Sequence, residues 1–130
     1  MNKLFYSCID SLIPSPQPEQ HLVIEKMAKL CNGKITYSTS EDCSLRNSQA
    51  WIEERVKRIP GIDGLIFFTV EQFYCAGKFN IRLLKILLSK NLEVHFAREK
   101  LSYRNLNDLD YAYDKGEIIF LDFLSYLKSK

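Results

Sequence analysis

The chain has 130 residues, of which 46% are hydrophobic and 26% are charged. This length and composition are typical of one soluble globular domain with a hydrophobic core. The 18 basic and 16 acidic residues are interspersed and give a net charge of +2, which argues against the strongly basic surface of a nucleic-acid-binding protein.

The cysteines and the apolar segments argue against several kinds of site and location. The four cysteines are far apart and form no Cys-x-x-Cys pair, so neither a metal site nor a disulfide framework is predicted. The first eight residues contain no apolar stretch long enough for a signal peptide, and no run has the length of a membrane span. We therefore expect a cytoplasmic protein with reduced thiols, no metal and no membrane span.

The first part of the chain predicts two strands with a helix between them. Residues Lys3–Ile9 are rich in aromatic and branched side chains and predict the first strand. The prolines in residues 14–18 predict a stiff loop. A helix with apolar residues at helical spacing is expected from Gln17 until the stop at Asn32-Gly33. Lys34–Ser38 is the expected second strand.

The middle of the chain predicts a further helix and then a β-α-β unit. Ser48 is a suitable cap for a helix that Pro60 ends. An apolar run then precedes an amphipathic segment and a second short run, as parallel strands joined by a helix require. The predicted strand, loop, helix and strand of this unit lie at Ile62–Thr69, 71–77, Phe79–Ser89 and Leu92–Phe96.

Four strands that alternate with helices predict the fold class. We expect one three-layer α/β domain over residues 1–130, with a mainly parallel four-stranded sheet flanked by helices. Its core is expected at residues 1–101 and a tail at 102–130. Residues 117–128 of the tail predict a helix that is apolar over most of its circumference, and such a helix is either core or covered by a partner. A homodimer through this tail helix is therefore one expectation.

A ligand site is expected where the carboxyl ends of the parallel strands meet at one edge of the sheet. Candidates for acid–base catalysis there are Glu99, His95, Glu41 and Asp10, since carboxylates and imidazole transfer protons. Candidates for binding a hydroxyl-rich substrate are the uncharged or basic side chains at this edge: Gln17, Gln20, Ser38, Gln72, Arg98 and Ser7.

Each of these candidates also has a purely structural interpretation. Glu41 and Glu99 are equally suited to capping a helix or pairing with a neighbouring cation such as Arg98. His95 is a proton-transfer group or a core histidine whose partners are all internal. If Val94 and Phe96 face one helix layer, strand alternation directs His95 toward the other. The glutamines are suited to fixing loop positions, and Asp10 to capping the proline loop. The chain has no glycine-rich phosphate loop, so no nucleotide cofactor is predicted.

Part of the sequence resembles the catalytic domain of serine recombinases. Residues 5–11 stand where that family has its first strand and Tyr-x-Arg-x-Ser motif, and residues 63–74 stand where a strand leads to its Asp-Arg-Leu-x-Arg motif. However, Asp10 lies near the position of the serine nucleophile, Cys8 replaces an arginine, and Glu71-Gln72-Phe73 replaces the second basic region. The resemblance implies a resolvase-like catalytic core without the recombinase reaction.

A second resemblance covers about residues 4–101. The sequence is similar to the bacterial family of sporadic carbohydrate cluster proteins, which belong to surface-polysaccharide biosynthesis loci. Four blocks carry the likeness in the same order: Pro16, Gln17, Gln20, Leu22, Val23 and Ile24; Ser38 and Glu41; Asp63, Gly64, Leu65 and Gln72; His95, Phe96, Ala97 and Glu99. The chain departs from the family where Ser7-Cys8 replaces a Ser-Arg pair.

This second resemblance implies a functional setting. We expect a protein of bacterial surface-carbohydrate biosynthesis that binds or modifies a sugar or nucleotide sugar at the carboxyl edge of its sheet. One alternative is a non-catalytic partner that docks on a biosynthetic enzyme through its apolar tail. Another is a degenerate resolvase-like nucleic-acid-binding domain, against which the mixed charge argues.

Overall fold

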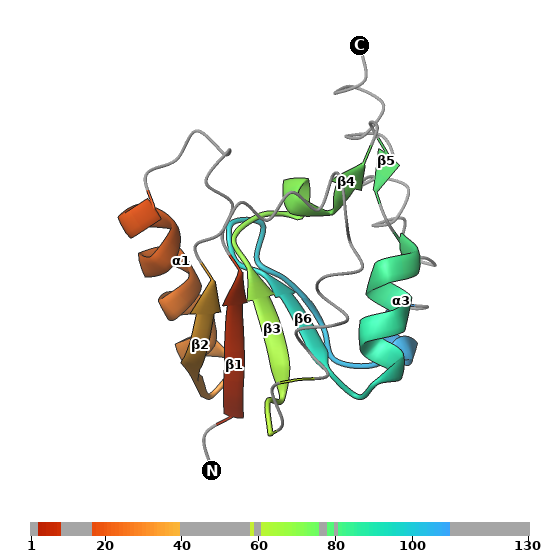
Figure 1. Cartoon of the computed structure of the whole chain (residues 1–130), viewed down its shortest axis with the longest axis horizontal. Coiled ribbons are helices and arrows are strands. Elements are labelled where there is room, and N and C mark those ends of the chain that lie inside the picture. The colour runs from red at the N-terminus through yellow and green to blue at the C-terminus, as the bar shows by residue number, and fades with distance from the viewer. Residues whose placement is uncertain are drawn as a thin grey trace.

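The protein is a mixed α/β fold in which helices α1 and α3 lie beside a five-stranded sheet (Figure 1). The computed structural model describes residues 3–8, 17–39, 58, 61–75, 78–79 and 81–109. The elements of the main sheet and the helices beside it are β1 (Lys3–Cys8), α1 (Gln17–Leu30), β2 (Gly33–Thr39), β3 (Gly64–Phe67), α3 (Ile81–Ser89), β6 (Glu93–Phe96) and β7 (Leu101–Tyr103). Between β3 and α3 lie the 3-10 helix η1 (Val70–Phe73) and the short strands β4 (Tyr74–Cys75) and β5 (Lys78–Phe79).

The main sheet has the strand order β2-β1-β3-β6-β7. Strands β2, β1, β3 and β6 pair in parallel, whereas β7 pairs with β6 in the antiparallel direction. Strands β4 and β5 form a separate antiparallel pair. The sheet is therefore mainly parallel, with one antiparallel edge strand.

Strand alternation divides the hydrophobic core between the two faces of the sheet. Leu65 and Phe67 belong to the cluster that contains the four buried leucines of α3. Ile66 belongs to a second cluster, with the buried residues Ile24 and Met27 of α1. The period of two residues directs successive side chains of β3 to opposite faces, so α1 and α3 cover opposite faces of the sheet.

Most of the predicted elements in the described part of the chain are confirmed. All four predicted strands and the helices at α1 and α3 are present, with ends that differ from the predicted ones by one or two residues. Asn32 and Asn91 adopt positive φ angles of 59° and 62° just after these helices. Beyond α3, the amide of Asn91 donates to the carbonyl of Leu88, and the amide of Leu92 donates to that of Leu87. This is the Schellman arrangement that satisfies the last carbonyls of a helix.

Two predictions about the fold are wrong in detail. The sheet has five strands instead of four, because the chain turns back at Ala97–Lys100 and adds β7. Lys100 adopts a φ of 57°, which lets this four-residue turn close without a glycine. The predicted loop at 71–77 also contains regular structure, since most of η1 and all of β4 lie there.

The packed core continues past residue 101. Tyr103 and Leu109 are buried in the cluster on the α3 face. Two predicted helices lie outside the described residues. One is the helix after Ser48, of which only residue 58 is described, and the other is the apolar helix at 117–128, through which a homodimer is expected.

Candidate functional site

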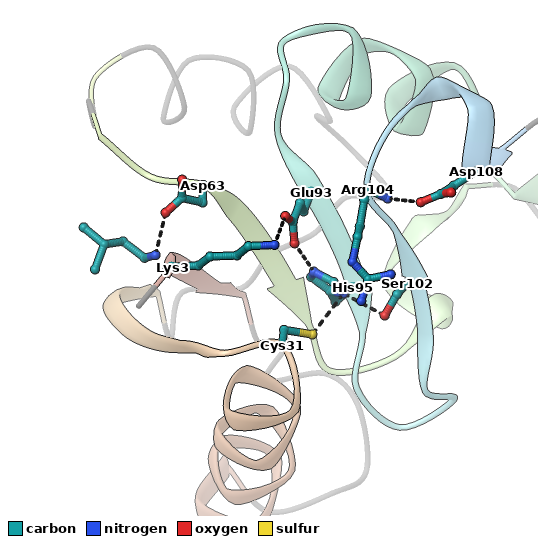
Figure 2. A network of polar contacts seen from close by, with 9 residues as sticks. Lys3, Cys31, Asp63, Glu93, His95, Ser102, Arg104 and Asp108 are labelled. Carbon is teal, nitrogen blue, oxygen red and sulfur yellow. Dashed lines mark hydrogen bonds and ion pairs between the residues drawn. The ribbon is translucent and has the colours of Figure 1, made fainter. Parts of the chain in front are cut away.

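A chain of polar contacts crosses the α1 face of the sheet and centres on His95 (Figure 2). The ammonium Nζ of Lys3 donates to Oε2 of Glu93 at 2.6 Å. The other oxygen of Glu93, Oε1, lies 2.9 Å from Nε2 of His95. The remaining ring nitrogen, Nδ1, lies 2.8 Å from Oγ of Ser102. Four residues from three strands are thus connected by three short contacts.

The sheet register explains why these side chains meet. Glu93 and His95 are two residues apart on β6 and therefore point to the same face. His95 lies directly opposite Ser102 in the antiparallel pairing of β6 with β7. On its other side, Glu93 is paired with Gly64 of β3, whose lack of a side chain leaves room beside it.

His95 is completely buried within this network. The ring of Phe5 meets the imidazole edge to face, with centroids 5.4 Å apart. The thiol sulfur of Cys31, the residue that follows α1, lies 3.5 Å from Nδ1. Glu93 and Ser102 are only partly buried, so the network leads from the core to the surface.

The chemistry of the partners fixes the tautomer of His95. An ionised carboxylate only accepts hydrogen bonds, so Nε2 of the imidazole carries the proton and donates it to Glu93. Nδ1 is then a lone-pair acceptor for the hydroxyl of Ser102. This is the relation of nucleophile, base and orienting carboxylate that activates a serine in many enzymes.

The ionisation states agree with this assignment. Burial lowers the pKa of His95 below its usual range, although the hydrogen bond that His95 donates to Glu93 opposes that effect. Burial acts to raise the pKa of Glu93, but the hydrogen bonds from Lys3 and His95 outweigh it and leave the pKa lowered. Burial raises the pKa of the Cys31 thiol. At neutral pH the site therefore holds a neutral imidazole, a carboxylate and a protonated thiol.

These pKa shifts predict that acid destabilises the fold. Unfolded His95 binds a proton near pH 6.5, whereas the folded, neutral imidazole resists protonation, so the free energy of unfolding should fall as the pH drops below 6.5. The lowered pKa of Glu93 adds a second loss below about pH 4.5. The uptake of one proton on unfolding changes the free energy of unfolding by at most about 1.4 kcal/mol per pH unit. Urea titrations at pH 7.5 and 5.5 measure the first loss, which should shrink in His95→Gln; an equal loss in that variant would contradict the assignment.

Glu99, the other predicted catalytic group with a described side chain, lies at the carboxyl edge and makes internal contacts. Its carboxylate accepts hydrogen bonds from the hydroxyl of Thr69 at 2.6 Å and from the backbone amide of Val70 at 3.0 Å. Val70 is the first residue of η1, so Glu99 caps that helix. Arg98 lies 3.3 Å from Glu99 and has its guanidinium 5.9 Å from the centre of the Phe68 ring.

Two of the three predicted glutamines, Gln20 and Gln72, are buried in the protein. Gln72 is buried; its Nε2 donates to the carbonyl of Cys8, and its Oε1 accepts from the amide of Thr69. Gln20 is also buried and has interactions of its own. For Gln72, these contacts match the structural interpretation, which is a side chain that fixes a loop against β1.

Ser7 differs from the glutamines. Its hydroxyl is buried on β1 and has no hydrogen-bond partner among the residues that the structure describes. Ser7 lies in the same lateral row of the sheet as Ile66, His95 and Ser102. It is therefore the one predicted contact residue that, within the described part, still offers an unused polar group.

Removing this hydroxyl should not destabilise the protein. A buried hydroxyl without a partner costs free energy, so Ser7→Ala should leave the free energy of unfolding unchanged or raise it by up to about 1 kcal/mol. Ser102→Ala, which breaks the bond to His95, should lower it by about 1 kcal/mol. Urea unfolding of both variants measures the contrast. A loss above 1 kcal/mol in Ser7→Ala would show that its hydroxyl is already bonded in the folded protein.

The remaining predicted site residues are only partly described. Asp10 and Glu41 lie outside the described residues. Gln17 begins α1 and Ser38 lies on β2, opposite Ser7, but the surroundings of their side chains are not described. The structure thus brings Gln72, Arg98 and Glu99 together around η1. It places the contacts of His95 elsewhere, toward Glu93 at the start of β6.

Sequence reasoning missed the partners of His95, which are Cys31, Glu93 and Ser102. It also missed Lys3, which pairs with Glu93. The Glu93-Val94-His95 alternation was a usable signal, because it places a carboxylate and an imidazole on one face of a strand. Ser102 gave no comparable signal, since its position depends on the turn before β7.

Comparisons with known proteins leave the family open. No protein-family model matches the chain, and no curated protein or solved structure is significantly similar to it. Among the described residues, no three His, Cys, Asp or Glu side chains are grouped as metal ligands. No helix in this part of the chain has both the length and the apolar character needed to cross a membrane.

Proposed function

We propose that this chain is a cytoplasmic protein of bacterial surface-carbohydrate biosynthesis that acts on a sugar or an activated sugar, with His95 as its acid–base group. The observation that carries the chemical part is the contact series Glu93–His95–Ser102, at 2.9 and 2.8 Å. The carbohydrate setting and a resolvase-like core rest on the sequence resemblances. The mainly parallel sheet agrees with a resolvase-like core only at the level of fold class.

The arrangement suits proton transfer to and from a hydroxyl group. A general base works best when its pKa lies near the operating pH and its lone pair is directed at the proton to be removed. His95 is held by Glu93 through one nitrogen and presents the other to a hydroxyl. Because His95 itself is buried, the partly buried Ser102 is the member of the pair that a ligand can reach.

The carboxyl edge has a different part in this proposal. Glu99 and Gln72 are engaged with the protein and hold η1 in place. Arg98 is about half exposed, with 48% of its side-chain surface accessible, and its guanidinium is of the type that binds an anionic group of an activated sugar. Asp10, Gln17, Ser38 and Glu41 remain candidates for further contacts to the sugar.

A thermal-shift panel tests this function. Free sugars, sugar phosphates and nucleotide sugars should be screened against wild type, Glu93→Gln and the control Glu25→Gln, which removes an exposed carboxylate of α1. A ligand at one hundred times its dissociation constant stabilises the fold by about 2.7 kcal/mol, which raises the Tm by several degrees. The ligand-induced shift should persist in Glu25→Gln and shrink in Glu93→Gln. No shift with any compound in wild type would refute the proposal.

A further inference from the structure

We propose that Ser102 is the nucleophile of an acyl-transfer reaction, with His95 as its base and Glu93 as the orienting carboxylate. This inference rests on the proposed function in one respect only. The alcohol that carries or accepts the acyl group would be a sugar hydroxyl. The substrate class is thus a carboxylic ester, such as an acylated sugar. The nucleophile itself is argued from geometry alone.

The distances satisfy the requirements for an activated serine. Oγ of Ser102 is within hydrogen-bond reach of Nδ1 of His95, at 2.8 Å, and the imidazole is in turn held by Glu93 at 2.9 Å. The ring nitrogens have exchanged the roles they have in the common Ser-His-Asp triad. This exchange does not alter the chemistry, because either nitrogen of a neutral imidazole can carry the proton while the other accepts one. The ammonium of Lys3 donates a hydrogen bond to Oε2 of Glu93, the carboxylate oxygen that does not contact His95.

Cys31 is the competing nucleophile, and the structure disfavours it. Its sulfur lies 3.5 Å from the same nitrogen, but the residue is buried with only 6% of its surface exposed. Burial also raises the pKa of its thiol, which disfavours the reactive thiolate. Ser102 lies closer to His95 and is more accessible.

Arg104 brings a positive charge close to His95 and Ser102. Figure 2 shows the side chain of Arg104 extending beside His95 and Ser102. Its charge acts at this site, since it contributes to the lowered pKa of His95 and partly opposes the rise that burial causes in the pKa of Cys31. Attack on an ester places negative charge on the former carbonyl oxygen, and a nearby guanidinium stabilises that charge. Arg104 is exposed and follows Ser102 by two residues.

The reaction balances without any further reagent. Oγ of Ser102 bonds to the carbonyl carbon while its proton moves to Nδ1 of His95. The bond between this carbon and the ester alcohol then breaks, and His95 returns the proton to the departing alcohol. The resulting acyl-serine is attacked by water or by a sugar hydroxyl, which gives its proton to His95. Release of the acyl group finally restores the proton to Ser102.

Covalent trapping with a fluorophosphonate tests the inference, because a serine with only a structural role does not react with it. We expect intact-mass analysis to show one adduct per chain and peptide mapping to place it on Ser102. The matched control Ser89→Ala removes an exposed serine whose hydroxyl only donates to the carbonyl of Ile86, and it should label like wild type. Ser102→Ala should not label, and Glu93→Gln should label at least about a hundredfold more slowly.

The pH dependence of labelling provides a readout that survives a poorly folding variant. The rate in wild type should follow the neutral form of His95 and reach half its maximum below pH 6.5. An unlabelled wild type, or an adduct on another residue, would overturn the inference. The sugar panel is independent of it: thermal shifts without labelling refute Ser102 alone, and labelling without shifts refutes the sugar alone.

Discussion

Gly64→Ala should lower the free energy of unfolding by about 3 kcal/mol, because the added methyl group has no space. An ideal Cβ at this position would lie 2.5 Å from the carbonyl oxygen of Glu93 and 2.8 Å from its Cβ. Both neighbours belong to β6, which is paired with β3 here, so neither can move without distorting the sheet. The methyl group would displace Glu93, whose carboxylate orients His95. The rate at which fluorophosphonate labels Ser102 should therefore fall together with the stability.

Urea unfolding measures this loss, and Gly61→Ala is the control. Gly61 has a φ of 84° and no atom within 4 Å of an added Cβ, so alanine there meets only the backbone strain. That strain costs about 1–2 kcal/mol. The control should also retain the reactivity of Ser102. Equal losses in the two variants would mean that β3 and β6 can separate enough to accept a methyl group.

Phe73→Ala should be more damaging, with a loss of about 3–5 kcal/mol. The ring is completely buried, with its centroid 4.7 Å from that of Phe67 and 5.0 Å from that of Phe96. Both contacts are edge to face, and they join η1 to the centre of the sheet. Removal of the ring leaves a cavity beside the sheet. The paired strands cannot move far enough to fill it.

Thermal and urea unfolding test this second expectation against Leu30→Ala. Leu30 is a large apolar residue at the end of α1 with 73% of its surface exposed, and its truncation should change the free energy by less than about 0.5 kcal/mol. A loss below 1 kcal/mol in Phe73→Ala would contradict the structure of η1 and its contacts with the sheet.

Much of the fold could be predicted because local signals and tertiary contacts agree. Helix α1 begins at Gln17, with Pro18 in its first turn, and ends at Leu30. Asn32 follows with a positive φ that asparagine tolerates well. β7 could not be predicted in this way. It has only three residues, and its turn contains none of the usual turn glycines, since Lys100 occupies the left-handed position.

The candidate site was predictable only in part, for the same reason. Strand alternation gave the face of His95 correctly, with Val94 and Phe96 in the cluster on the opposite side. It did not indicate which groups the imidazole contacts, because Ser102 comes from the unforeseen β7. For Glu99, the capping interpretation describes the observed contacts, but the short helix that it caps was not predicted.

The contacts around His95 also differ in how far apart they lie along the chain, and this orders their formation during folding. His95 and Ser102 are 7 residues apart within one hairpin, whereas Lys3 and Glu93 are separated by 90. Hairpins close in about 1–10 μs, but parallel pairing of distant strands must first overcome the entropy of a long loop. The base and its hydroxyl should therefore meet early, while Glu93 remains solvated and without its cation. The arrival of β1 then brings Lys3 to Glu93 and Phe5 to His95, and only this late step creates the buried environment that keeps the imidazole neutral.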